Sequence, residues 1–208
     1  MYDRGVDPVS AFILAGGRSL RMGQDKAFLR LGGGTLLTHA LERARAAAGS
    51  VCIVGNAEKF AAFAPVVEDV YPQRGPLGGI HAALTRTATD LNLVVAVDLP
   101  FIQPNFLHYL IVRARETDAV VVVPKTGEGL QPLCAVYRRS FSEVADRSLR
   151  AGRNKIDSLF GEVQTRVVGP EELKLNKFSE EMFRNLNTKR DWEEAGNRAS
   201  DLGPQASA

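Results

Sequence analysis

Short apolar runs and amphipathic helical patterns alternate along most of this chain. The apolar runs predict buried strands at residues 11–15, 51–54, 66–67, 91–97 and 119–123. Between them, apolar residues at helical spacing predict helices at residues 35–48, 57–63, 77–87 and 104–115. Alternating strands and helices are typical of βαβ units, in which helices cover both faces of a parallel sheet. The sequence therefore predicts an α/β fold.

The second half of the chain keeps this period less cleanly. We expect strands at residues 133–136 and 165–168, and helices at residues 140–150 and 189–197. Residues 199–208 are small, polar and contain proline and glycine, which predicts a disordered tail. We therefore expect a flexible N-terminus over residues 1–9, a single domain over residues 10–198 and the tail after it.

Composition narrows the class of partner. The 208 residues include 26 Lys and Arg against 24 Asp and Glu, a formal net charge of +2. This near balance gives no electrostatic reason to expect a nucleic acid or an anionic membrane as partner. No apolar run reaches the roughly 18 to 20 residues that span a bilayer, and no apolar segment of a secretory signal precedes the first core run. We expect a cytoplasmic protein in which any basic site is local.

Polar and glycine residues follow the predicted strands. Five strand ends run into Gly16 and Gly17, Gly55 and Asn56, residues 68–69, Asp98, and residues 124–125. Such residues are also ordinary in turns. However, the carboxyl ends of parallel strands meet at one edge, where open α/β sheets bind their ligands. The pattern predicts a ligand site at that edge.

The segment LAGGRSLRMGQDK, residues 14–26, is the strongest candidate for a phosphate-binding loop. Gly16 and Gly17 let the backbone approach a ligand closely, and Arg18, Arg21 and Lys26 can bring three cations to a polyphosphate. The spacing of the glycines fits neither the P-loop of ATPases and GTPases nor the G-x-G-x-x-G of dinucleotide-binding enzymes. A different kind of nucleotide loop is indicated.

Asp98 is the candidate metal ligand. It follows the apolar run of residues 93–97, so its carboxylate would stand rigidly at the sheet edge. Carboxylate oxygens suit Mg²⁺, which accompanies a nucleoside triphosphate. We expect Asp98 to bind Mg²⁺.

Four motifs in this order resemble the molybdenum cofactor guanylyltransferases, the MobA family. They are LAGGRSLRMGQDK at residues 14–26, RGPLGG at 74–79, VDLP at 97–100 and NLNT at 185–188. The resemblance covers residues 12 to about 192. It implies a Rossmann-like three-layer nucleotidyltransferase fold with a mostly parallel central sheet. The implied activity joins GMP from GTP to the terminal phosphate of molybdopterin with Mg²⁺, releasing pyrophosphate.

The resemblance also assigns residues. It implies that Leu14, Ala15, Gly16, Gly17, Lys26 and Asp98 contact the nucleotide, that Asn56 and Asp69 match guanosine-binding positions, and that Asp98 also holds Mg²⁺. Lys26, Arg21 and the metal would supply the positive charge that phosphoryl transfer needs. An acceptor phosphate is already anionic and needs no general base, so we expect His39, His81 and His108 to serve packing.

The acceptor side should be locally basic. Arg147, Arg150, Arg153 and Lys155 crowd nine residues around a predicted helix end, where cations are also favoured simply by the helix dipole. In the resembled family this region lies on the pterin side, which favours Arg153 and Lys155 as molybdopterin ligands. Asn185 and Asn187 of the NLNT motif are further candidates for that side.

Two other functions fit the same sequence. A cytidylyltransferase of the same fold would differ by a few base contacts, and a nucleotide-binding regulatory protein would bind without turnover. The presence of both Lys26 and Asp98 argues against the second. Transient contacts with proteins that deliver or receive the cofactor stay open.

Overall fold

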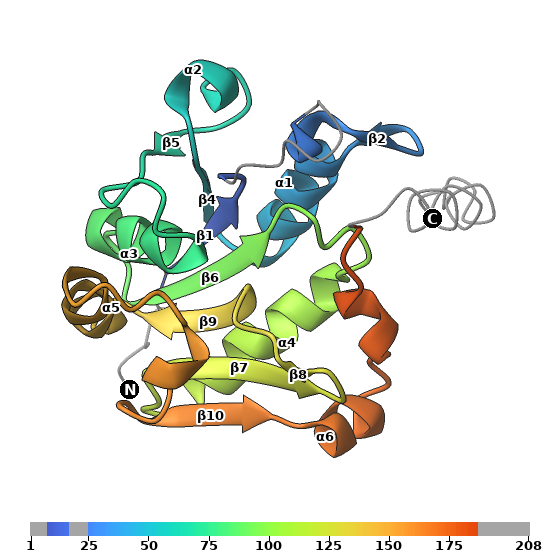
Figure 1. The fold of residues 1–208 in the computed structure, drawn as a ribbon. Coiled ribbons are helices and arrows are strands. Elements are labelled where there is room, and N and C mark those ends of the chain that lie inside the picture. The colour runs from blue at the N-terminus through green and yellow to red at the C-terminus, as the bar shows by residue number, and fades with distance from the viewer. Residues whose placement is uncertain (1–7, 17–24, 187–208) are drawn as a thin grey trace, which may run out of the picture.

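The computed structural model describes residues 8–16 and 25–186, and its centre is one mixed sheet (Figure 1). The strand order is β10-β7-β9-β6-β1-β4-β5, with the short β8 paired to β7. The bounds are β1 Val9–Leu14, β4 Ser50–Val54, β5 Val66–Val67, β6 Leu91–Ala96, β7 Val121–Thr126, β8 Gly129–Leu130, β9 Cys134–Arg138 and β10 Thr165–Val168.

Most of the sheet is parallel. β1 pairs in parallel with both β4 and β6, β4 with β5, and β10 with β7. β9 is antiparallel to its two neighbours β6 and β7. The carboxyl ends of the other long strands therefore meet at one edge, and the predicted fold class is confirmed.

Helices cover both faces of the sheet. Figure 1 shows α1 and α4 on one side and α3 and α5 on the other. The bounds are α1 Leu36–Ala47, α2 Ala57–Phe60, α3 Pro76–Arg86, α4 Pro104–Arg115, α5 Phe141–Arg150 and α6 Pro170–Leu175. Single 3₁₀ turns lie at η2 Lys26–Phe28, η3 Asp157–Leu159 and η4 Glu180–Phe183, and β2 Arg30–Leu31 pairs with β3 Gly34–Thr35.

Each strand divides its side chains between two cores. In β1, Ala11 and Ile13 pack with the α1 and α4 side, whereas Phe12 and Leu14 pack with the α3 and α5 side. This alternation follows from the two-residue period of a strand. Because both faces are buried, the strand is apolar throughout, which is why it reads as a continuous run in the sequence.

Local signals fix where the helices begin. Thr35 caps α1: its hydroxyl accepts the Thr38 N–H at 3.2 Å, and the Thr38 hydroxyl accepts the Thr35 N–H at 2.8 Å. α3 and α4 begin at Pro76 and Pro104, where a missing N–H costs nothing.

Several predicted boundaries were wrong. The fifth predicted strand was ended at residue 123, but β7 continues through Pro124 and Lys125 to Thr126. Pairing continues because the Pro124 carbonyl accepts the Gln131 N–H at 2.8 Å.

Val9, expected in a flexible terminus, is a buried residue of β1. The helix expected over residues 57–63 ends at Phe60, and α6, β2, β3 and β8 were not expected. The expected helix 189–197 and tail lie outside the described residues.

Candidate nucleotide site

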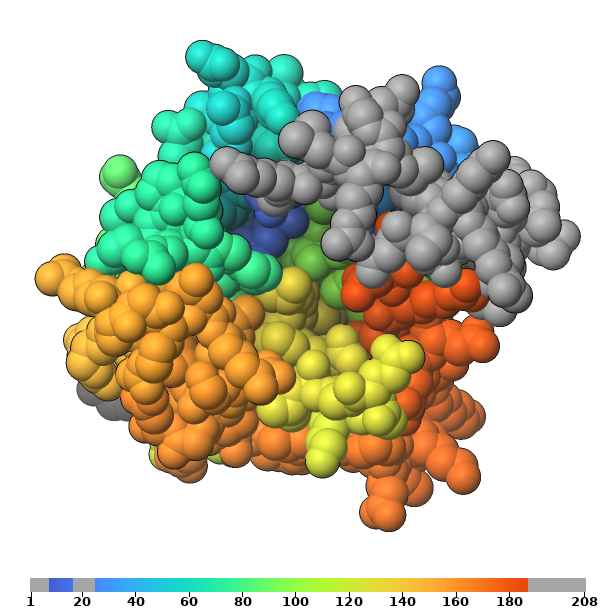
Figure 2. Space-filling view, in the orientation of Figure 1, coloured from blue at the N-terminus to red at the C-terminus, as the bar shows by residue number. Residues whose placement is uncertain are grey.

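A cavity of about 600 Å³ opens at the edge where the parallel strands end. In Figure 2 it lies in the hollow whose floor shows the first strand in dark blue and the region of β6 in green. The lining residues come from the ends of β1, β4 and β6, from the segments after β1, β4, β5 and β6, from the first turn of α3 and from the residue before β9. They are Leu14, Ala15, Gly16, Asp25, Lys26, Val54, Gly55, Asp69, Gln73, Gly75, Pro76, Gly79, Ala96, Val97, Asp98 and Leu133.

Backbone hydrogen bonds lock the strand ends beneath this cavity. The N–H groups of Ala15 and Gly16 both donate to the Val54 carbonyl, at 3.0 and 3.1 Å, and the Val97 N–H donates to the Leu14 carbonyl at 3.1 Å. These hydrogen bonds hold the backbone of Ala15 and Gly16 in place. Both residues line the cavity, so a ligand there can come close to the backbone. The predicted site residues Leu14, Ala15 and Gly16 all line it.

Lys26 and Asp98 face each other in the cavity. The Lys26 Nζ lies 3.5 Å from the Asp98 Oδ2, with about a quarter of each side chain exposed. The two residues come from different elements, Lys26 from the turn η2 and Asp98 from the segment after β6. A cation and a carboxylate therefore meet in the lining of this cavity.

Asp25 holds Lys26 in place. Its carboxylate caps η2 by accepting the Ala27 N–H at 3.2 Å, and its other oxygen pairs with the Lys59 Nζ of α2 at 2.9 Å. A capping carboxylate fixes the first residues of a helical turn. The direction in which Lys26 leaves the backbone is therefore set by Asp25 and, through it, by α2.

Asp69 also lines the cavity and lies in the segment after β5. Its carboxylate accepts the Tyr71 N–H at 3.2 Å and lies against the first turn of α3. A Cβ at Gly78 would come within 2.9 Å of the Asp69 Oδ1, so this close approach requires glycine there. Burial raises the pKa of Asp69, while the Tyr71 N–H and the charge of His81 act in the opposite direction.

The donor set fits a magnesium ion that arrives with a nucleotide. The described residues contain no group of three or more His, Cys, Asp or Glu side chains placed to hold a metal. Mg²⁺ is commonly bound by one or two carboxylates, with phosphate oxygens and water completing its six ligands. Asp98 faces the cavity with a partly exposed carboxylate, which suits this kind of site.

Asn56, which the family resemblance assigns to the nucleotide, is not among the residues that line the cavity. It is exposed, and its side-chain oxygen caps α2 by accepting the Lys59 N–H at 3.0 Å. Its neighbour Gly55, rather than Asn56, lines the cavity. A Cβ at Gly55 would come within 2.8 Å of the Phe60 ring, so packing of α2 accounts for this glycine.

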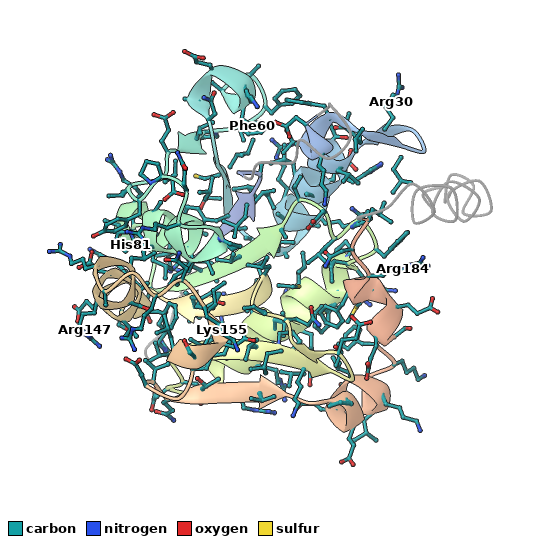
Figure 3. All side chains as sticks on the ribbon, viewed as in Figure 1. Arg30, Phe60, His81, Arg147, Lys155 and Arg184 are labelled. Atoms are coloured by element: carbon teal, nitrogen blue, oxygen red, sulfur yellow. The ribbon has the colours of Figure 1, made fainter. Side chains whose placement is uncertain are left out.

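The predicted acceptor residues lie away from the cavity lining. Arg153 is exposed and pairs with Glu162 at 3.8 Å, and Lys155 is exposed in the segment between α5 and η3. Figure 3 places Lys155 in front of β7, on the face that carries the hollow. Asn185 is exposed beside Leu186, whose N–H donates to the Asp98 carbonyl at 3.4 Å. The NLNT motif therefore begins next to Asp98. Gly17, Arg21 and Asn187 lie outside the described residues.

Some lining residues were not predicted. Asp25, Gln73, Gly75, Gly79 and Leu133 line the cavity but were not selected as site residues. Gln73 has a φ of 66°, which is uncommon for a residue with a side chain, and Gly75 has a φ of 67°. The strained turn aims this segment at the cavity. A sequence signal existed for three of these five residues, because Asp25 belongs to the LAGGRSLRMGQDK motif and Gly75 and Gly79 belong to the RGPLGG motif.

Comparisons with known proteins agree with this geometry. Residues 11–166 match the MobA-like NTP transferase domain. The chain belongs to this family. A probable molybdenum cofactor guanylyltransferase of Pelotomaculum thermopropionicum is 38% identical over 181 residues, covering 86% of this chain and 87% of the relative. One of Carboxydothermus hydrogenoformans is 34% identical over 182 residues, covering 87% and 91%.

Solved structures support the same fold. The molybdopterin-guanine dinucleotide biosynthesis protein A of Archaeoglobus fulgidus aligns with a TM-score of 0.81 at 27% identity, covering 93% of this chain and all (100%) of the other. A 2-C-methyl-D-erythritol 4-phosphate cytidylyltransferase of Thermus thermophilus aligns with a TM-score of 0.66 at 17% identity, covering 91% and 98%. The second likeness concerns the fold alone. The fold therefore does not by itself decide which base is used.

Proposed function

We propose that this protein transfers GMP from GTP to the terminal phosphate of molybdopterin and forms the guanine dinucleotide of the cofactor. The observation that carries the proposal is the pairing of Lys26 with Asp98 in the cavity of a MobA-like domain. The relatives named as molybdenum cofactor guanylyltransferases support the choice of substrates.

The reaction requires little covalent help from the protein. An oxygen of the acceptor phosphate bonds to the α-phosphorus of GTP while the bond from that phosphorus to the bridging oxygen of pyrophosphate breaks. Catalysis of such a transfer is mainly positioning and electrostatic stabilisation. Lys26 serves the triphosphate, Arg21 of the same sequence motif adds positive charge, and the glycine-lined edge lets the nucleotide come close to the backbone.

Asp98 is the residue that would hold Mg²⁺. The ion, when bound, neutralises charge that develops on the transferred and departing phosphates. The backbone carbonyl of Asp98 accepts the Leu186 N–H, which ties the backbone at Asp98 to the segment where the NLNT motif begins.

The acceptor would lie on the side of Arg153 and Lys155, and Asn185 and Asn187 of the NLNT motif would be further acceptor ligands. The two cations are exposed and therefore available to a phosphate. Gly17 and Asn56 would add the remaining nucleotide contacts that the family resemblance implies; because the Asn56 Oδ1 caps α2, the side-chain amide nitrogen of Asn56 would make its contact. A protein that uses GTP and this cofactor would work in the cytoplasm and meet the proteins that deliver and receive the cofactor. The described residues form no helix long and apolar enough to cross a membrane.

The test is direct. The purified protein is incubated with molybdopterin and GTP, with Mg²⁺ or with a chelator, and the product is identified by mass. The expected product is the guanine dinucleotide, formed together with pyrophosphate and only when the metal is present. Binding of GTP without any transfer would support the regulatory alternative instead.

A further inference from the structure

A cluster of polar side chains joins the nucleotide cavity to helix α5. It consists of Tyr71 in the segment after β5, His81 and Thr85 of α3, and Asp146 and Arg150 of α5. Figure 3 places His81 on α3 beside α5. None of these residues lines the cavity, but Tyr71 contacts Asp69, which does.

The Asp69 carboxylate lines the cavity, where it can accept hydrogen bonds from a ligand. Within the described residues, its half-buried carboxylate accepts one hydrogen bond, from the Tyr71 N–H. An ionised carboxylate has about four acceptor sites and rarely stays buried without partners. The other lining residues nearby are mainly apolar or glycine. Among the nucleobases, guanine alone offers two adjacent donors, N1–H and the 2-amino group, that one carboxylate can accept together.

The position of Asp69 depends on Tyr71. The Tyr71 N–H holds the Asp69 Oδ1, and the Tyr71 carbonyl would lie 3.1 Å from a Cβ at Gly78, so both residues rest on the first turn of α3. The Tyr71 side chain points the other way. Its hydroxyl donates to the Asp146 Oδ1 at 2.6 Å, and its ring packs edge-on against His81 at a centroid distance of 5.1 Å.

Asp146 anchors the Tyr71 hydroxyl. The hydrogen bond from Tyr71 lowers the pKa of Asp146, and Arg150, whose Nε lies 2.8 Å from the Asp146 Oδ2, lowers it as well. His81 faces the same carboxylate at 3.7 Å and also feels the charge of Asp69, but burial lowers its pKa. At neutral pH Asp146 is therefore charged and His81 is neutral, so the Tyr71 hydroxyl has a fixed, charged acceptor.

We propose that Tyr71 is a positioning residue for guanine recognition: its hydroxyl, anchored on Asp146 of α5, fixes the backbone that presents the Asp69 carboxylate to N1–H and the 2-amino group of the base. The proposal rests on the proposed function, because it takes GTP as the donor. It makes helix α5 part of the machinery that selects the base, although α5 does not line the cavity.

The experiment compares GTP with inosine triphosphate, which lacks the 2-amino group. Direct binding and transfer kinetics are measured for the wild type, Tyr71→Phe, Asp146→Ala and Asp146→Asn. In Tyr71→Phe and Asp146→Ala, the Kd and KM for GTP should rise by about fivefold or more, the loss of one hydrogen bond, while kcat changes little. The preference for GTP over inosine triphosphate should shrink. Asp146→Asn keeps an oxygen that accepts the hydroxyl and should retain most of the preference.

Tyr109→Phe is the matched control. Tyr109 donates to the Glu172 Oε1 at 2.7 Å, so the variant also removes a hydroxyl bonded to a carboxylate, but it does so between α4 and α6. It should lose stability without changing the preference for GTP. A purely structural role for Tyr71 would make the two variants alike.

The outcomes separate the two proposals. A wild-type protein that forms no guanine dinucleotide contradicts the proposed function. A wild type that transfers GMP without preferring GTP over inosine triphosphate, or a preference that survives in both Tyr71→Phe and Asp146→Ala, overturns the role of Tyr71 alone. If Tyr71→Phe does not fold, the two Asp146 variants still decide the question.

Discussion

The Lys26 Nζ lies 3.5 Å from the Asp98 Oδ2 in the lining of the cavity at the carboxyl ends of the parallel strands. In the free protein these side chains partly neutralise each other. A triphosphate and its metal would replace that contact with two stronger ones, the ammonium to phosphate and the carboxylate to Mg²⁺. The pair therefore predicts different behaviour for variants of the two residues.

Asp98→Asn tests the metal role. The change keeps the volume of the side chain but removes the charge that a hard cation prefers, so the fold should persist. Transfer of GMP should fall by at least about 10²-fold, roughly 2.7 kcal/mol of transition-state stabilisation. Excess Mg²⁺ should restore part of the activity. Wild-type turnover at limiting Mg²⁺ would exclude Asp98 as a metal ligand.

Lys26→Ala should affect binding itself. Loss of a charge-assisted hydrogen bond of about 1.5 to 3 kcal/mol would weaken GTP binding by roughly 10- to 150-fold, whatever the magnesium concentration. Asp98→Asn provides the contrast, because without metal it should bind GTP as well as the wild type or better, having lost a repulsive charge. Calorimetric titration with GTP and no metal measures both. Equal affinities of Lys26→Ala and wild type would remove Lys26 from the triphosphate site.

Asp69→Asn should make the protein more stable at neutral pH. Burial raises the pKa of Asp69 in the folded state, so the folded protein binds this proton more tightly than the unfolded chain does. The stability from the protonated form is complete below the ordinary pKa of 3.8 and is lost as the pH rises through the raised value. At neutral pH the buried charge therefore costs stability, and the uncharged amide avoids this cost.

Thermal melting of Asp69→Asn and wild type at about pH 7 and about pH 4 checks the sign. The melting temperature of the variant should exceed that of wild type at the higher pH, and the gain should shrink at the lower pH. The same variant should bind GTP more weakly. A variant less stable than wild type at neutral pH would contradict the cost assigned to the buried carboxylate.

Replacing both Arg153 and Lys155 with Ala should weaken molybdopterin binding and leave GTP binding nearly unchanged. Each lost contact with a phosphate is worth roughly 1.5 to 3 kcal/mol. The matched control replaces Arg86 and Arg139 with Ala, which also removes two exposed cations, but at the opposite end of the sheet. There the Arg139 N–H donates a hydrogen bond to the Asp90 carbonyl. Separate titrations with the two substrates are the measurement. Equal losses for both substrates, or no loss, would place the acceptor elsewhere.

The strand-end chemistry could be predicted from the sequence because it is local. Gly16 and Asp98 each follow an apolar run that could be identified as a strand, and parallel strands bring such ends together. Lys26 could be identified because it belongs to the motif that follows the first of these strands. The antiparallel direction of β9 and the continuation of β7 through Pro124 depend on partners far along the chain, which a local pattern does not contain.

The supporting contacts could not be predicted. Tyr71 and Asp146 are 75 residues apart in the sequence, and their hydrogen bond exists only because α3 and α5 pack on the same face. Asp25 lies within the LAGGRSLRMGQDK motif, yet its contact with Lys59 depends on the position of α2 in the fold. Asn56 differs from these residues because its contact is local. Its side-chain oxygen caps α2, although the family resemblance assigns this residue to the nucleotide.

The most direct test of the account is the choice of donor. The protein is incubated with molybdopterin, Mg²⁺ and GTP, CTP or ATP in parallel, the dinucleotide product is identified by mass, and kcat/KM is determined for each donor. The account predicts that GTP gives the highest kcat/KM and the guanine dinucleotide as the main product. A kcat/KM for CTP equal to or above that for GTP would contradict it, although the fold would stand.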